Sequence, residues 1–164
     1  MKRFIALLLI FLSFLSLNGC THSFSDQTNF YYCSAKYQFG EDLPIIQPES
    51  RDISGHEGEL SYLIALYLAG PSDKKFTSPF PKNTKLLSVQ TKGNTVTIEL
   101  SHLGRQLSDS EFILACACLT FTAIDFTEAE EVSIISGEKT ITLGKDDLLL
   151  YDTITAPAET EGVK

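Results

Sequence analysis

The chain has 164 residues, of which 13 are Lys or Arg and 21 are Asp or Glu, so its formal net charge is −8. This acidic balance argues against nucleic acid as a partner, because domains that bind nucleic acid carry basic surfaces. The length suits one domain with a sizeable core, and we find no internal repeat or long linker that would divide it.

The amino terminus has the pattern of a secretory signal peptide. Lys2 and Arg3 precede an apolar run from Phe4 to Leu17, which is shorter than the roughly 20 residues that a membrane-spanning helix needs. The sequence LNGC at residues 17–20 resembles the lipobox of bacterial lipoproteins, in which the cysteine is lipidated and becomes the first mature residue. We therefore expect a diacylglyceryl group on Cys20 to anchor the protein at the extracytoplasmic face of the cell membrane. An uncleaved anchor or a chance cysteine at this position is the alternative.

Cleavage before Cys20 would leave 145 of the 164 residues and, with two basic side chains lost, a net charge of −10. Residues 20–29 are short and polar and are expected to form a flexible tether. We expect the domain over residues 30–155. Residues 156–164 have almost no apolar side chains and are expected to be a disordered tail.

Two extended segments open the domain. Residues 30–39, FYYCSAKYQF, alternate as a half-buried strand does and place on one side Tyr31, Cys33, Ala35, Tyr37 and Phe39. Residues 43–53, LPIIQPESRDI, predict a second extended segment. Pro44 and Pro48 confine that segment to a sheet edge or an irregular path, because proline donates no ladder hydrogen bond.

The next segment predicts a helix. Ser54 and Glu57 have the S-x-x-E spacing of a capping box. Apolar side chains follow at helical spacing, at Leu60, Leu63, Ile64, Tyr67 and Leu68. Gly70 and Pro71 then end the helix, since glycine adopts a left-handed conformation and proline cannot continue the helix.

The second half repeats this alternation. Residues 86–91 and 95–100 predict a hairpin around Lys92-Gly93-Asn94. Ser108 and Glu111 form another S-x-x-E pattern before the apolar run 112–126, which predicts a buried helix. Alternation over Leu119 to Ala123 also permits a strand, but the capping box and the length favour a helix.

Residues 131–136 and 139–144 predict a second hairpin around Gly137-Glu138, and residues 147–154 an edge strand. The resulting order is β-β-α-β-β-α-β-β. We therefore predict an α+β domain with a mixed or antiparallel sheet and two helices packed on one face of it.

Besides Cys20, the chain has three cysteines, Cys33, Cys116 and Cys118. Their number and spacing indicate neither a complete set of internal disulfides nor a metal site. On one helix, Cys116 and Cys118 point to nearly opposite sides and cannot bridge each other. We expect all three to be buried free thiols, and we predict no metal and no cofactor.

The segments from Phe30 to Leu143 together resemble the GerMN domain, found in bacterial sporulation and spore-germination proteins and in many envelope lipoproteins. The resemblance is strongest at Leu68, Gly70 and Pro71, which close the first helix, and at Pro81, Thr84 and Leu87, which enter the next strand. Asn83 stands where the family usually has glycine, but asparagine tolerates the same turn. The resemblance implies a non-catalytic extracytoplasmic domain that assembles with envelope proteins or with copies of itself, and it carries over no catalytic residues.

The candidate catalytic groups do not form a motif. HEGE at residues 56–59 lacks the second histidine of H-E-x-x-H. A hydrolase would combine His102 and Asp109 or Asp125 with a serine, Ser101 or Ser108, yet no G-x-S-x-G is present. We predict a protein that is not an enzyme, with a small-ligand-binding lipoprotein and an envelope hydrolase as alternatives.

Five lysines lie between residues 73 and 92, opposed only by Asp73 in this stretch of an acidic chain: Lys74, Lys75, Lys82, Lys85 and Lys92. They form a candidate contact for a partner or an anionic surface, because lysines near anionic headgroups bind favourably. Acidic residues at 127–131 and 145–147 would form the opposite pole. A solvated loop without a binding role is the simpler interpretation.

Overall fold

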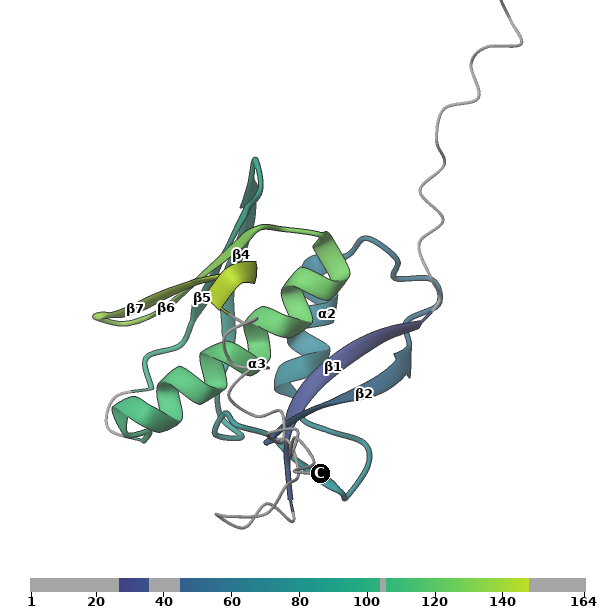
Figure 1. The fold of residues 1–164 in the computed structure, drawn as a ribbon, viewed down its shortest axis with the longest axis horizontal. Helices are drawn as coiled ribbons and strands as arrows, with labels where there is room; N and C mark the ends of the chain where they lie inside the picture. Colours follow the sequence, from purple (N-terminus) through teal and green to yellow (C-terminus); the bar gives the residue numbers. More distant parts are fainter. Residues whose placement is uncertain (1–26, 36–44, 104–105, 148–164) are drawn as a thin grey trace, which may run out of the picture.

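The computed structural model describes residues 27–35, 45–103 and 106–147 (Figure 1). The elements follow one another as β1 (Gln27–Ser34), β2 (Ile46–Asp52), α2 (Leu60–Leu68), β3 (Phe76–Thr77), β4 (Leu86–Lys92), β5 (Thr95–Leu100), α3 (Asp109–Thr127), β6 (Glu131–Ser136) and β7 (Lys139–Gly144). The predicted α+β class is confirmed, and the short strand β3 is added to the predicted order.

The strands form two sheets, whereas we predicted one. The first has the order β2-β1-β3 and is antiparallel, and the second has the order β4-β5-β6-β7. In the second sheet β5 and β6 pair in parallel, because α3 connects them and returns the chain to the same end of the sheet. The two predicted hairpins, β4–β5 and β6–β7, are confirmed as its antiparallel pairs.

Strand β1 is covered by helices on both sides. Phe30 and Tyr32 are fully buried, and their rings stack on Tyr67 of α2. Tyr31 and Cys33, on the side that we predicted to be apolar, are half-buried and contact α3. The prediction that both helices cover one face was wrong for this strand, since Figure 1 shows α3 between the β1–β2 pair and strands β4 to β7.

The strand boundaries differ from the predicted ones. β1 begins at Gln27, so residues 27–29, expected in the tether, belong to the sheet. The predicted strand positions 36–39 and 43–44 lie outside the described residues, as do 148–154 of the predicted edge strand. Asp147, expected to begin that strand, lies in a helical turn with Lys145 and Asp146.

The two predicted capping boxes had different outcomes. Ser108 caps α3: its Oγ accepts the N–H of Glu111 at 3.3 Å, and the Glu111 carboxylate accepts the N–H of Ser108 at 2.8 Å. Ser54 does not cap α2, which starts at Leu60 without a side-chain cap. Gly55 (φ +81°) and Gly58 (φ +83°) turn the chain before the helix begins, so Ser54 instead bonds the carboxylate of Asp52.

Helix α3 is long and apolar enough to cross a bilayer. Its apolar side chains are used in the domain instead, because α3 packs on β1, β6, β7 and α2 and buries most of its middle residues. Among them are Ala115, Cys116, Cys118 and Leu119, which have no exposed surface. The predicted buried helix is thus confirmed as the central element of the core.

Candidate functional site

The turn after α2 is fixed by a buried ion pair. Gly70, with φ +97°, ends the helix as predicted, and its N–H donates to the carbonyl oxygen of Tyr67 at 3.0 Å. From β2, a guanidinium nitrogen of Arg51 donates to the carbonyl oxygen of Gly70 at 2.6 Å and lies 2.7 Å from the Glu49 carboxylate. Glu49 in turn accepts the backbone N–H of Asp73 at 2.7 Å.

This pair lies in an aromatic setting. The side chains of Arg51 and Glu49 are only 11% and 8% exposed, and the guanidinium lies 4.9 Å from the ring centre of Phe30. The sequence pattern did not indicate this pair. Two charges two residues apart share one side of a strand, but that spacing alone does not distinguish a buried pair from a solvated one.

The turn leads into the lysine segment, and all five lysines are exposed. Lys75 lies 3.4 Å from Asp73, and its carbonyl oxygen accepts the N–H of Ala35 beyond the end of β1. Lys85 precedes β4 and Lys92 ends it, so about 23 Å of extended chain separates the two. The structure therefore does not bring Lys92 together with Lys85.

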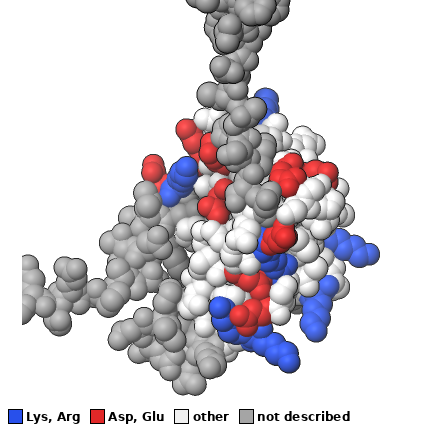
Figure 2. Space-filling view, turned by 90° about the vertical axis from the view of Figure 1, so that its right-hand side faces the viewer, with Lys and Arg blue, Asp and Glu red and all other residues white. Residues whose placement is uncertain are grey.

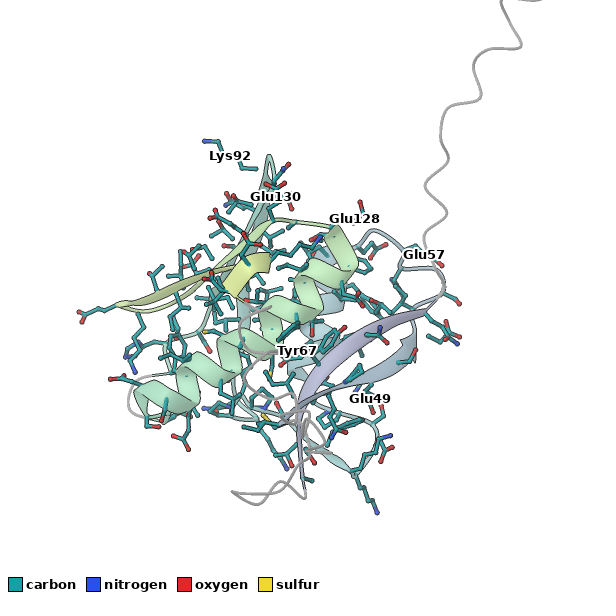
Figure 3. All side chains as sticks on the ribbon, viewed as in Figure 1. Glu49, Glu57, Tyr67, Lys92, Glu128 and Glu130 are labelled. Atoms are coloured by element: carbon teal, nitrogen blue, oxygen red, sulfur yellow. The ribbon has the colours of Figure 1, made fainter. Side chains whose placement is uncertain are left out.

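Lys92 lies instead at the acidic end of the molecule. Figure 3 shows Lys92 at the same end as Glu128 and Glu130, with Glu49 at the opposite end. The carbonyl oxygen of Asn94, next to this hairpin tip, accepts the N–H of Glu130 at 2.9 Å. The face in Figure 2 shows basic and acidic side chains interspersed, so no single sign of charge covers it.

The candidate catalytic residues occupy structural positions. Ser101 Oγ accepts the N–H of Lys85 at 3.0 Å, and Ser108 caps α3. Asp109 binds Lys139 at 2.9 Å, and this hydrogen bond lowers the pKa of the aspartate. Within the described parts of the chain, no hydrogen bond is found from His102 to a serine or to an aspartate.

His102 lines a cavity of about 250 Å³ with Leu103, Leu107, Phe112, Ser136, Glu138 and Lys139. The ring is in close contact with Gly137, where an added Cβ would lie 2.0 Å from His102 Nδ1. The other histidine of interest, His56, stacks on Tyr62 at 3.7 Å and lies 3.3 Å from Glu59. In the HEGE sequence, the Glu57 carboxylate accepts the N–H of Gly55.

A second hollow, of about 570 Å³, lies where β5 and β6 begin and β7 ends. It is lined by Asn94, Thr95, Glu130, Glu131, Gly144, Lys145, Asp146 and Asp147. Thus the predicted acidic segments 127–131 and 145–147 meet at one end of the second sheet. Among residues 27–35, 45–103 and 106–147, no group of three or more His, Cys, Asp or Glu side chains is arranged to hold a metal ion.

The three described cysteines are free thiols, as predicted, but their surroundings differ. Cys116 and Cys118 are buried, whereas Cys33 is only partly buried. Burial raises the pKa of Cys116 to about 12. Cys33 Sγ lies 3.9 Å from Cys118 Sγ, and their hydrogen bond lowers the pKa of Cys33 and raises that of Cys118. The two residues are 85 positions apart, so no local pattern indicated their contact.

These observations define the class as a small α+β domain in which two sheets enclose a central helix. The chain belongs to the Germane family of sporulation and spore germination, whose sequence profile matches residues 29–142. The resemblance to the GerMN domain is thereby confirmed.

Two solved structures are similar to this chain. One is the first GerMN domain of the sporulation protein GerM from Bacillus subtilis, with 14% identity, a TM-score of 0.54, and coverage of 71% of this chain and 86% of that chain. The other is a Clostridium perfringens protein provisionally described as a lipoprotein, with 22% identity, a TM-score of 0.46, and coverage of 74% and 88%. A comparison with individual characterised proteins gave no match.

Proposed function

We propose that this protein is a lipid-anchored module of the bacterial cell envelope that acts in sporulation or spore germination through contacts with other proteins, without catalysis of its own. The observation that carries the proposal is Cys20. Cys20 follows two basic residues, an apolar run and a small residue, which is the order typical of lipoprotein signals. The family to which the chain belongs is that of sporulation and spore germination.

The position of Cys20 also limits where the domain can lie. Seven Cα steps separate Cys20 from Gln27, the first residue of β1, and they span at most about 25 Å. A domain on so short a tether stays near the bilayer surface. This suits a protein that binds neighbours in the same membrane or in the adjoining wall.

The charged side chains at the two ends of β1 indicate that the lysines contact a partner protein and not the bilayer. At the tether end, Gln27 pairs with Asp52, and Figure 3 shows Glu57 beside this end of β1. At the other end, about 27 Å away along the extended chain, the N–H of Ala35 donates to the carbonyl oxygen of Lys75. Anionic headgroups would repel the first end, so we propose that the lysine end faces away from the membrane.

The two alternative functions are less well supported. A ligand-binding lipoprotein needs an enclosed apolar pocket of roughly 300–1,000 Å³. The cavity beside His102 measures about 250 Å³ and includes Glu138 and Lys139, and the hollow of about 570 Å³ has a polar and charged lining. A hydrolase needs a nucleophile hydrogen-bonded to a base. Ser101 Oγ accepts a backbone N–H, and Ser108 Oγ is held in the capping box of α3, where it donates to the Glu111 carboxylate at 2.7 Å and accepts the Glu111 N–H. Among the described residues, neither serine is hydrogen-bonded to His102.

Metabolic labelling with a fatty acid tests the anchor. The wild-type protein should incorporate the label and fractionate with membranes, whereas Cys20→Ala should do neither. Cys33→Ala is the matched control and should be labelled like the wild type. Equal labelling of Cys20→Ala would refute the lipobox. If only the wild type is labelled, crosslinking in native membranes should identify partners of the wild type and not of Cys20→Ala.

A further inference from the structure

Two thiols from distant parts of the chain meet at the contact between β1 and α3. Cys33 Sγ and Cys118 Sγ are 3.9 Å apart, and a disulfide would require an approach to about 2.05 Å. Their elements are already held together nearby. The N–H of Tyr31 donates to Thr122 Oγ1 at 3.0 Å, and the rings of Tyr31 and Phe121 stack at 5.2 Å.

We infer that Cys33 and Cys118 are a dithiol site that forms an intramolecular disulfide by exchange with a disulfide-bearing oxidant, either a small-molecule or a protein disulfide. The approach needed is about 2 Å, which is within reach of side-chain rotation combined with a small shift of β1 along α3. The described residues contain no other pair of cysteine sulfurs in contact.

The two sulfurs would have different roles. The thiolate of Cys33, which is partly exposed, attacks one sulfur of the oxidant, forms a mixed disulfide and expels the other sulfur as a thiolate. Cys118, fully buried behind it, then loses its proton and attacks the Cys33 sulfur, which releases the second thiolate. The protein loses two hydrogen atoms and two thiols form from the oxidant. The lowered pKa of Cys33 agrees with its role as the attacking group.

Cys116 provides the internal comparison. It is buried on the same helix, but it lies two positions from Cys118 and therefore projects in a different direction. Burial raises its pKa to about 12, which disfavours the thiolate. The disulfide should therefore exclude Cys116, although all three thiols lie in one domain.

The disulfide would tie the lysine segment to the core. Cys33 pairs with Thr77 of β3, and Ala35, two residues later, bonds the carbonyl oxygen of Lys75. Linking this end of β1 to α3 would restrain the turn that carries Lys74 and Lys75. Formation of the disulfide in the cell rests on the extracytoplasmic location proposed above, where disulfides persist. The exchange reaction itself does not depend on that location.

The test uses the full protein extracted from membranes in detergent. The protein is reduced, incubated with oxidised glutathione, denatured, alkylated and digested for mass spectrometry. We expect a linked peptide pair containing Cys33 and Cys118, two hydrogen atoms lighter than the separate peptides, with Cys116 alkylated. Oxidation should raise the melting temperature by about 10 °C, since the crosslink closes a long loop.

Two variants separate the possible outcomes. Cys116→Ala should still form the linked pair, and Cys33→Ser should show the same melting temperature with and without oxidant. A glutathione adduct that persists on Cys33, a link to Cys116, or a folded wild type that gives no link would each overturn the inference. Fatty acylation is read from the same digest: a free thiol at Cys20 would contradict the proposed anchor and leave the result for Cys33 and Cys118 unaffected.

Discussion

At the residue scale, Gly70 was predicted to end α2 and does so through its backbone conformation. Its φ of +97° allows the chain to leave α2, and its carbonyl oxygen is oriented to accept from Arg51. A Cβ at this position would meet only Ser78 Cβ, at 3.9 Å. The requirement for glycine is therefore conformational and does not arise from crowding.

Gly70→Val should lower the free energy of unfolding by more than about 1 kcal/mol, because a β-branched residue is strained at positive φ. Gly93→Asn is the control. Gly93 has φ +59° at a hairpin tip with nothing within 4 Å of an added Cβ, and asparagine adopts this conformation readily. Urea unfolding curves measure both variants. Equal stability of Gly70→Val and the wild type would show that Gly70 does not set the end of α2.

Two stacked tyrosines have hydroxyl groups in opposite situations. The rings of Tyr32 and Tyr67 lie 4.8 Å apart and both are fully buried. The Tyr32 hydroxyl donates to the Tyr67 carbonyl oxygen at 2.9 Å, whereas the Tyr67 hydroxyl is buried without a partner among the described residues. Burial raises the pKa of both phenols.

Removing each hydroxyl should therefore have a different effect. Tyr32→Phe should cost about 1 kcal/mol, since it removes one of the two hydrogen bonds that the buried Tyr67 carbonyl oxygen accepts and leaves the bond from the Gly70 N–H. Tyr67→Phe should leave the stability unchanged or raise it by up to about 1 kcal/mol, since it removes an unpaired polar group. Thermal unfolding of the two variants compares them directly. A larger loss for Tyr67→Phe would show that its hydroxyl has a partner.

At the element scale, the same S-x-x-E pattern succeeded once and failed once. After Ser108 the apolar run begins at once, so the helix starts where the pattern places it. After Ser54, two glycines at positive φ use residues 55–58 for turns. Local patterns thus predicted the strands other than β3, both helices and the stop at Gly70, because these depend on nearby residues.

Contacts between distant elements were not predictable in this way. The first sheet gains β3, a strand of two residues, and the second sheet has α3 as the crossover between its parallel strands β5 and β6. The Glu49–Arg51 pair and the Cys33–Cys118 contact arise only when β2, β1, α2 and α3 pack. A single sequence shows no period or spacing for such contacts.

The capping box of α3 gives the domain a pH dependence. Hydrogen bonds from the hydroxyl and N–H of Ser108 lower the pKa of Glu111 below its ordinary value of 4.5. A carboxylate with a lowered pKa in the folded state stabilises the fold above its unfolded pKa, and this contribution is lost as the pH falls through the folded pKa. Stability should therefore decline as the pH drops below about 4.5.

Glu111→Gln should be less stable than the wild type at pH 7 and should show a weaker decline in acid. Ser108→Ala removes the other half of the box and should cost about 1 kcal/mol at pH 7. Since the two residues act on each other, the double variant should lose less than the sum of the single losses. Urea midpoints measured from pH 7 to pH 3 test this, and strict additivity would contradict the reciprocal cap.

At the scale of the whole molecule, acidic and basic side chains lie at opposite ends of β1. Strand β1 begins beside Asp52 and Glu57, and Lys74 and Lys75 lie beyond its other end. A second acidic end, with Glu128 and Glu130, carries Lys92. We therefore propose that the basic segment of one molecule contacts an acidic end of another protein or copy.

Exposed charge pairs contribute only about 0–1 kcal/mol each, so a multiple change is needed to test this contact. Changing Lys74, Lys75, Lys82 and Lys85 to Glu should leave the fold intact, because all four side chains are exposed, and should abolish co-purification of envelope partners. The control changes Lys92 and Lys145 to Glu at the acidic end and should retain the partners. Unaltered co-purification by the fourfold variant would exclude this surface and direct attention to exposed apolar side chains such as Leu87 and Ile113.

Single changes at the candidate catalytic residues test whether the protein works without catalysis, as the proposal requires. A module that acts through surface contacts should keep its cellular function in His56→Ala, His102→Ala and Asp125→Ala, because no one of these side chains supplies a contact surface. His102 is the most informative, since it lines the cavity next to Ser136 and contacts Gly137. A folded His102→Ala protein that lost its function would contradict the module and favour the hydrolase, since removal of one imidazole from this cavity changes little surface but would remove the histidine that the hydrolase alternative uses as its base.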